Sequence, residues 1–248
     1  MFSQEECSRA SVIFGVNTYC MPKGVISALL RRGMDSWFFI TADHAFGHAL
    51  EADASNFVRQ GGGKALGAVR APTHSTDYSS FLLQAQASGA KVIGLAVQGA
   101  DFQNLVKQAT EFGLRKSGVT VAGLFVLDNQ MIGAGLDNTA GMVASGALYR
   151  NMNDDTRAFA KRIMRTSGGV PPNGVQAAPY SATLHYLRDM EAAGALDGQA
   201  MRPMYLMQVK TPAESTTQYD IFKIQDEISP QDSWKPLSQS VCPFIVNK

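Results

Sequence analysis

The hydrophobic pattern of the chain is most regular in its first half, where short apolar runs alternate with segments whose apolar residues recur at helical spacing. Strand-like and helix-like segments alternate there in the order 37–42, 45–60, 64–72, 77–89, 91–96 and 101–113. Strands that alternate with helices of this length predict a parallel sheet with helices on its faces. The pattern therefore predicts an α/β protein.

The pattern changes in the second half. The remaining elements are expected as strands at 119–127 and 141–149, helices at 153–168 and 181–196, and strands at 204–210 and 219–225. Asp154 or Asp155 is expected to open the first of these helices, and Pro171-Pro172 to break it. The loop between the last two strands is long for a tight hairpin, but the pair is most simply antiparallel.

Composition describes a globular protein and narrows the classes of partner. Hydrophobic residues make up 45% of the 248 residues and charged residues 17%, so the chain can bury a sizeable core. A net charge of +1 gives no reason to expect nucleic acid as a partner. No apolar run approaches the roughly 20 residues that a membrane span requires. The N-terminal residues lack the basic and apolar regions of a secretion signal.

The three cysteines, Cys7, Cys20 and Cys242, have no metal-ligand spacing. One disulfide and a free thiol, or three thiols, fit the sequence equally. The motifs of phosphate loops, dinucleotide sites, nucleophile elbows and zinc proteases are all absent. These absences disfavour an enzyme, and we expect no cofactor and no metal.

The best candidates for a ligand site follow the predicted parallel strands, because ligands of such sheets bind outside the carboxyl ends of the strands. Three loops meet there, at 43–47, 73–77 and 97–101. Asp43 is expected to cap the helix that follows it. His44 and His48 stand four residues apart and could face one metal, but without a third ligand a cap or surface role is favoured.

Four other side chains at this edge carry open alternatives. Phe46 suits either the core or the wall of a ligand pocket. Gln98 is either exposed or a ligand contact, since burial of its amide would need hydrogen-bond partners. Asp101 fits a helix cap better than a ligand contact. For Asp128, which follows the fourth strand, the two roles are balanced.

Longer blocks of sequence carry a resemblance to a family. The blocks FFITADHAFGHALE, SSFLLQAQASGAKVIGLA, KQATEFGL and MYLMQVKTPAES resemble periplasmic substrate-binding proteins of ABC transporters, in the leucine/isoleucine/valine-binding group with its amide- and urea-binding relatives. The resemblance covers roughly residues 15 to 245. It implies a type I periplasmic-binding fold, in which two α/β lobes joined by three crossovers close on a small ligand.

On that template, the chain is expected to hold one complete parallel-sheet lobe and part of another, because family members have a much longer N-terminal region. The expected parts are a remnant of the first lobe at 1–34, the second lobe at 35–149, first-lobe helices at 150–202, a strand pair returning to the second lobe at 203–227, and a tail at 228–248. A second gap against the family lies near 198–203. The chain therefore resembles a truncated member.

The resemblance also implies roles for five residues. Phe46 matches the aromatic residue after the first strand of the second lobe, and Gln98 and Asp101 fall in the loop after the third. Asp128 falls after the fourth strand, where amino-acid binders place a carboxylate that faces the ligand ammonium. His44 stands where near relatives commonly have tyrosine.

The function that the resemblance implies is capture of a branched-chain amino acid, an amide or urea for delivery to an ABC permease in the membrane. The family is periplasmic. Because half of the cleft is missing from the template match, we expect this chain to bind weakly. Two alternatives stay open, a cytoplasmic amide or amino-acid sensor with the same fold and, less favoured, an α/β enzyme.

Overall fold

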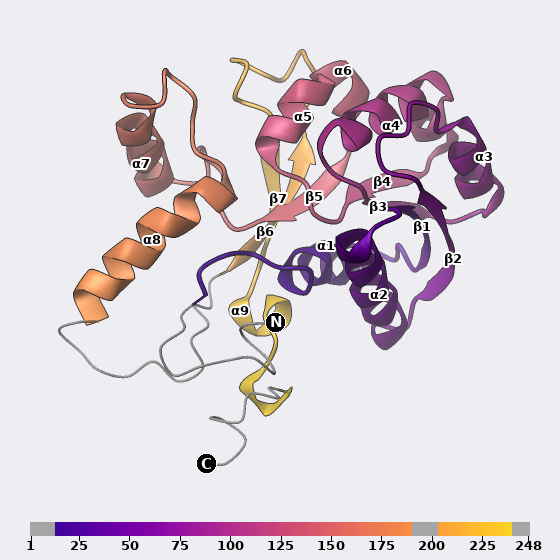
Figure 1. Ribbon diagram of the computed structural model, residues 1–248, viewed down its shortest axis with the longest axis horizontal. Helices are drawn as coiled ribbons and strands as arrows, with labels where there is room; N and C mark the ends of the chain where they lie inside the picture. Colours follow the sequence, from indigo (N-terminus) through magenta and orange to yellow (C-terminus); the bar gives the residue numbers. More distant parts are fainter. Residues whose placement is uncertain (1–12, 190–202, 240–248) are drawn as a thin grey trace.

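The computed structural model describes residues 13–189 and 203–239, and its centre is a seven-stranded mixed sheet with the order β2-β1-β3-β4-β5-β6-β7 (Figure 1). The strands are β1 (Ser36–Ala42), β2 (Lys64–Ala71), β3 (Val92–Ala96), β4 (Thr120–Gly123), β5 (Val143–Gly146), β6 (Met204–Val209) and β7 (Phe222–Ile228). Strands β1 to β5 pair in parallel, whereas β6 pairs antiparallel with both β5 and β7. The predicted α/β class and the antiparallel final pair are confirmed.

Helices cover both faces of the sheet. They are α1 (Cys20–Arg31), α2 (Ala45–Gln60), α3 (Ser79–Ala87), α4 (Gly99–Glu111), α5 (Asp128–Ala134), α6 (Leu136–Thr139), α7 (Asp154–Met164), α8 (Gly174–Asp189) and α9 (Pro230–Ser233), with 3₁₀ turns η1 (Leu114–Ser117) and η2 (Leu237–Gln239). Helices α1 and α2 lie on one face, and α3, α4 and α5 on the other (Figure 1).

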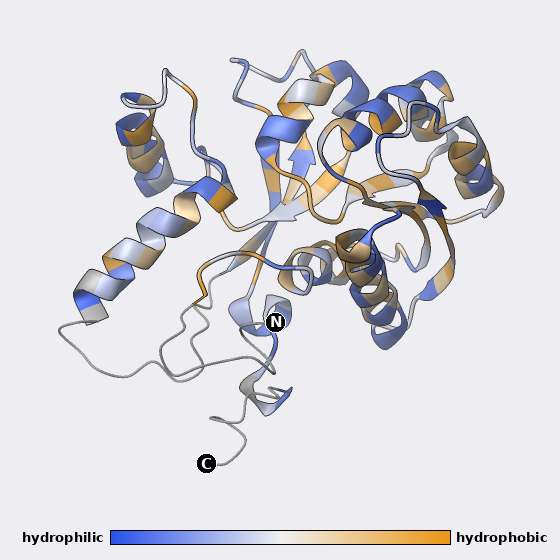
Figure 2. Ribbon diagram, viewed as in Figure 1, coloured by the Kyte–Doolittle hydropathy of each residue, from blue (hydrophilic) through white to orange (hydrophobic). Residues whose placement is uncertain are grey.

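Strand β1 shows why the sheet is buried on both sides. Trp37 and Phe39 pack into the core under α1 and α2, and Phe38 and Ile40 pack into the core under α3 and α4. Figure 2 shows the consequence, with apolar residues along the central strands and hydrophilic residues on the outward faces of the helices. A parallel strand covered on both faces reads as a continuous apolar run, as WFFITA does.

Several predicted boundaries differ from the structure. Helix α2 has the predicted bounds, but β4 ends at Gly123 rather than continuing to 127. The Leu124 N–H still donates to the Leu95 carbonyl over 3.1 Å, but β5 pairs only with Ala122 and Gly123. Beyond that point the chain has no neighbouring strand to pair with, so it turns away from the sheet.

Helix α8 begins at Gly174, seven residues before the predicted start at 181. The Asn173 Oδ1 atom accepts from the Gln176 N–H over 2.8 Å, and the Gln176 Oε1 atom accepts from the Asn173 N–H over 3.1 Å. This reciprocal cap starts the helix. Pro179 lies inside the helix.

Helix α1 was not predicted. Its buried residues recur at helical spacing, but Pro22 and Gly24, which are poor helix formers, lie within its first two turns. Gly24 lets this helix approach the sheet closely, since a Cβ atom there would lie 3.3 Å from Ser145 and Ile228 side-chain atoms.

Helices α7 and α8 stand beside the sheet rather than on it (Figure 1). They contact each other through the rings of Phe159 and Tyr180, whose centroids are 4.8 Å apart. Helix α7 begins at Asp154, one of the two expected starts, and Asn153 supplies the capping oxygen to the Thr156 N–H over 2.9 Å. The assignment of 150–202 to another lobe stays a prediction, and 190–202 lie outside the described residues.

Cys20 is buried on α1. Cys7 and Cys242 lie outside the described residues, as do parts of the predicted segments 1–34 and 228–248. The question of disulfide pairing therefore stays as the sequence left it.

Candidate functional site

The candidate site lies at the carboxyl ends of β1, β3 and β4. These strands are parallel neighbours, so the loops that follow them emerge at one edge of the sheet. His44 follows β1, Gln98 follows β3, and Phe125 and Asp128 follow β4.

His44 is the N-cap of α2. Its backbone is extended, and its Nδ1 atom accepts a hydrogen bond from the Gly47 N–H over 3.2 Å. The expectation that Asp43 is the cap is therefore wrong, because the helix begins at Ala45 and the residue directly before it occupies the capping position. An Nδ1 atom that accepts leaves the proton of the neutral imidazole on Nε2.

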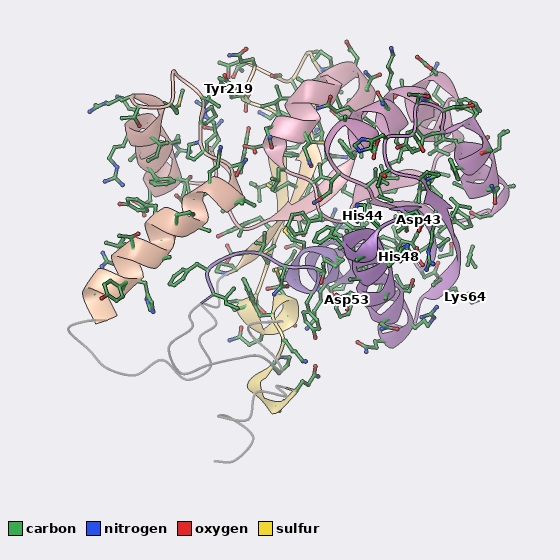
Figure 3. The ribbon with its side chains drawn as sticks, viewed as in Figure 1. Asp43, His44, His48, Asp53, Lys64 and Tyr219 are labelled. Carbon is green, nitrogen blue, oxygen red and sulfur yellow. The ribbon has the colours of Figure 1, made fainter. Side chains whose placement is uncertain are left out.

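Asp43 instead interacts with His48, one turn into the helix. The His48 Nε2 atom lies 2.7 Å from the Asp43 carboxylate, and the three side chains Asp43, His44 and His48 gather at the start of α2 (Figure 3). The Nδ1 atom of His44 thus interacts with Gly47 and the Nε2 atom of His48 with Asp43, so the two histidines have different partners. Among the described residues, no group of three or more His, Cys, Asp or Glu side chains could hold a metal ion.

Phe46 and Phe125 form what we call the aromatic wall. Their rings meet edge to face with centroids 5.4 Å apart, and both are half-buried. The His44 ring lies 6.4 Å from the Phe46 ring. Val16 and Tyr19, from the segment before α1, pack in the same apolar cluster.

Sequence reasoning missed Phe125, because it read 119–127 as one strand. The available signal was Gly123, since a glycine inside a strand pattern often marks a bend or a close approach.

Gln98 connects the loop after β3 to the aromatic wall. Its side-chain Nε2 donates to the Phe125 carbonyl over 3.2 Å, and the side chain is half-buried. The structure thus brings together three of the five predicted residues, His44, Phe46 and Gln98. They lie around Phe125, which the sequence did not predict as a site residue.

Asp101 interacts with the loop after β2 and not with the aromatic wall. It lies in the first turn of α4, where Gln98 is the N-cap, so the favoured expectation that Asp101 caps this helix is wrong. Its carboxylate accepts from the His74 N–H over 3.0 Å. His74 has a φ of 62°, a left-handed conformation that is unusual for a residue with a Cβ atom. Burial and then the Asp101 charge raise the pKa of Tyr78, which ends this loop.

Asp128 is the first residue of α5 and is half-buried. It lines a narrow cavity of about 20 Å³ together with Val16, Met21 and Gly146. That volume holds about one water molecule. Burial raises the pKa of the Asp128 carboxyl, and the hydrogen bond from the Asn129 N–H over 3.0 Å partly opposes this.

Comparison with known proteins gives the family. The family described as periplasmic binding protein matches residues 2–213. The chain belongs to this family. Members are periplasmic binding proteins of ABC transporters, which bind solutes and are not enzymes. Among curated proteins, none matches the chain.

Two solved members of the family are similar over nearly the whole chain. One is a branched-chain amino acid ABC transporter periplasmic ligand-binding protein from Burkholderia xenovorans LB400, with 32% identity, a TM-score of 0.92, and coverage of 98% of this chain and 72% of that one. The other is a periplasmic binding protein from Burkholderia mallei, with 35% identity, a TM-score of 0.86, and coverage of 98% and 71%.

A third structure shows the fold alone. It is a leucine-, isoleucine-, valine-, threonine- and alanine-binding protein from Brucella ovis in a closed conformation, with 16% identity, a TM-score of 0.82, and coverage of 98% of this chain and 69% of that one. The type I periplasmic-binding fold predicted from the sequence is confirmed. Within the described ranges, no helix is long and apolar enough to cross a bilayer.

Proposed function

We propose that the chain acts as the solute-binding component of an ABC transporter, capturing a branched-chain amino acid, a small amide or urea between two lobes for delivery to a membrane permease. The observation that carries this proposal is the grouping of His44, Gln98 and the aromatic wall at the carboxyl edge of the sheet. A cluster of half-buried rings beside a few polar groups is the usual composition of a small-molecule site.

Each residue of the site has a role in this proposal. The aromatic wall would contact the apolar body of the solute. A side-chain N–H of Gln98 donates to the Phe125 carbonyl. The Oε1 atom of Gln98 would therefore accept a hydrogen bond from a solute N–H. His44 would donate through Nε2 to a carboxylate or carbonyl oxygen.

Two acidic residues complete the proposed site. Asp128 would pair with an ammonium or amide N–H, an interaction that strengthens when closure of the lobes excludes water. Asp101 would act from the rim, where it also holds the backbone of His74.

We further propose that residues 1–248 bind solute weakly when tested alone. The described residues supply one wall, and His44 is exposed on it. A solute held by one wall keeps much of its surface in water, so both burial and electrostatic attraction are reduced. Micromolar binding of leucine to this chain by calorimetry would contradict this part of the proposal.

The test is a thermal-shift screen with leucine, isoleucine, valine, urea and short amides. It compares this chain with a chimera that also carries the part of the Burkholderia xenovorans relative that this chain does not cover. We expect stabilisation of the chimera by one of these solutes and little change in this chain. Stabilisation of neither protein by any solute would contradict the proposed function.

Two rival functions predict other results. A cytoplasmic amide or amino-acid sensor would pair the same site with a regulatory partner, and the transporter proteins found by comparison do not favour it. An α/β enzyme would turn over an amide, which a mass-spectrometric screen of the same solutes would detect.

A further inference from the structure

A second concave feature lies on α7 and shares no lining residue with the cavity beside Asp128. It is an open hollow of about 500 Å³, which we call the basic hollow, and its lining includes Arg150, Arg157, Lys161 and Arg165 around Ala160 and Met164. None of its described lining residues is a carboxylate. The whole chain carries a net charge of only +1, so this concentration of positive charge is local.

The cations of the basic hollow are mostly unneutralised. Arg157 donates to Asp154, a fully exposed residue of the same helix, over 2.5 Å. Within the described residues, Arg150, Lys161 and Arg165 form no ion pair. Their charges therefore stay available to a partner.

Three of the cations form a ladder on one helix face. Arg157, Lys161 and Arg165 are spaced four residues apart, which puts neighbouring Cβ atoms about 5–6 Å from each other. Like charges at this spacing destabilise a helix. Folding stability by itself therefore does not favour this arrangement.

The helix macrodipole explains only part of the ladder. Lys161 and Arg165 lie at the C-terminal end of α7, where positive charge is favourable. Arg157 lies near the opposite end, and Arg150 precedes the helix. The Arg150 carbonyl accepts from the Thr156 hydroxyl over 3.1 Å, which ties this residue to the start of α7.

The floor between the cations is apolar. Ala160 is buried and Met164 is half-buried. A concave apolar floor under a rim of guanidinium and ammonium groups suits the side chains of a partner protein better than the flat headgroup layer of a membrane. Arginine also binds carboxylates through two parallel hydrogen bonds.

We propose that the basic hollow is a docking site for an acidic helix of a partner protein, with carboxylates one turn apart that match the ladder on α7. The lining of the basic hollow includes none of the residues proposed for the solute site, so the proposal does not depend on which solute the protein binds.

The test uses a fluorescein-labelled helical peptide, built on alanine and glutamine, with three glutamates at i, i+4 and i+8. Its partner peptide carries glutamine at the same three positions. Fluorescence anisotropy at low salt should show binding of the glutamate peptide only. Binding should weaken as salt rises, because the pairs are exposed.

The matched variants change two charges each. Lys161→Gln with Arg165→Gln removes half of the cations of the hollow, and Lys107→Gln with Lys116→Gln removes two exposed lysines elsewhere. We expect the first pair to weaken peptide binding by roughly tenfold, which corresponds to about 1.4 kcal/mol. The control pair should bind like the original protein, and both should keep its circular dichroism spectrum and Tm.

Four results would overturn the proposal. They are no binding of the glutamate peptide, equal binding of both peptides, equal weakening by the control pair, and binding to phosphatidylglycerol vesicles that depends on Lys161 and Arg165 while the peptide does not bind. The last result would assign the surface to lipid headgroups.

Discussion

The rings of Phe46 and Phe125 meet edge to face at 5.4 Å, although the two residues follow different strands and lie far apart in sequence. The contact joins the start of α2 to the loop after β4. It also positions the Phe125 carbonyl, which accepts from Gln98. An aromatic pair of this geometry is worth about 0.5–1.5 kcal/mol beyond its buried area.

Phe125→Ala should therefore affect solute binding more than folding. Because the ring is only half-buried, we expect a loss of about 1–2 kcal/mol in the free energy of unfolding. Chemical-shift changes at Phe46 and Gln98 on titration with millimolar leucine should shrink or disappear. Phe112→Ala is the control, since that ring is 36% exposed and lies at the other end of α4. Equal shift changes in both variants would remove Phe125 from the site.

Gly47→Ala should disturb the start of α2. A Cβ atom at this position would clash with the Ala42 carbonyl oxygen at the end of β1. We expect a loss of about 1–3 kcal/mol in the free energy of unfolding, measured in urea, because the helix must move away from the sheet. Gly15→Ala is the matched control, since a Cβ atom there would meet nothing within 4 Å. A Gly47→Ala protein as stable as this control would show that the helix start can shift freely.

His44 should stabilise the folded protein because its side chain caps the N-terminus of α2. His44→Leu removes the acceptor for the Gly47 N–H and should cost about 0.5–2 kcal/mol, whereas His44→Asn keeps a capping oxygen and should cost much less. Urea unfolding of the two variants measures the difference. If both lose the same stability, the hydrogen bond to Gly47 is not what His44 contributes.

The Lys210–Asp220 ion pair should make stability depend on pH under acid conditions. Burial opposes the charge of Asp220, but hydrogen bonds from Lys210 (2.7 Å) and from Thr216 outweigh this and hold its pKa at about 2. A carboxyl whose pKa is lower in the folded state stabilises the protein above its unfolded pKa. This contribution, on the order of 2 kcal/mol, should be lost as pH falls from about 4 to about 2.

Asp220→Asn isolates that contribution. The variant should be less stable at neutral pH and should lose less stability than the original protein between pH 4 and pH 2, as measured by urea unfolding at each pH. Asp155→Asn is the control, because that carboxylate is exposed on α7, far in the sequence from the Lys210–Asp220 pair. A pH profile that Asp220→Asn leaves unchanged would contradict the assignment.

Much of the sheet could be predicted from local periodicity. The run WFFITA and the helix 45–60 each carry a pattern within a few turns of chain, and α2 has the bounds that its pattern indicates. The strand pair at β6 and β7 was predictable for the same reason. Helix α1 was not predicted, because Pro22 and Gly24 weaken the helix signal of its first two turns.

The sequence could propose His44, Phe46 and Gln98 as neighbours because each follows a predicted parallel strand, and the carboxyl ends of such strands share one edge. Only the tertiary structure decided what these side chains contact. The early end of β4 depends on how far its neighbours pair with it, which no local pattern records, and that end places Phe125 against Phe46. Likewise, the direction of Asp101 toward His74 follows from the packing of α4 beside the loop after β2, an arrangement fixed by contacts between residues distant in sequence.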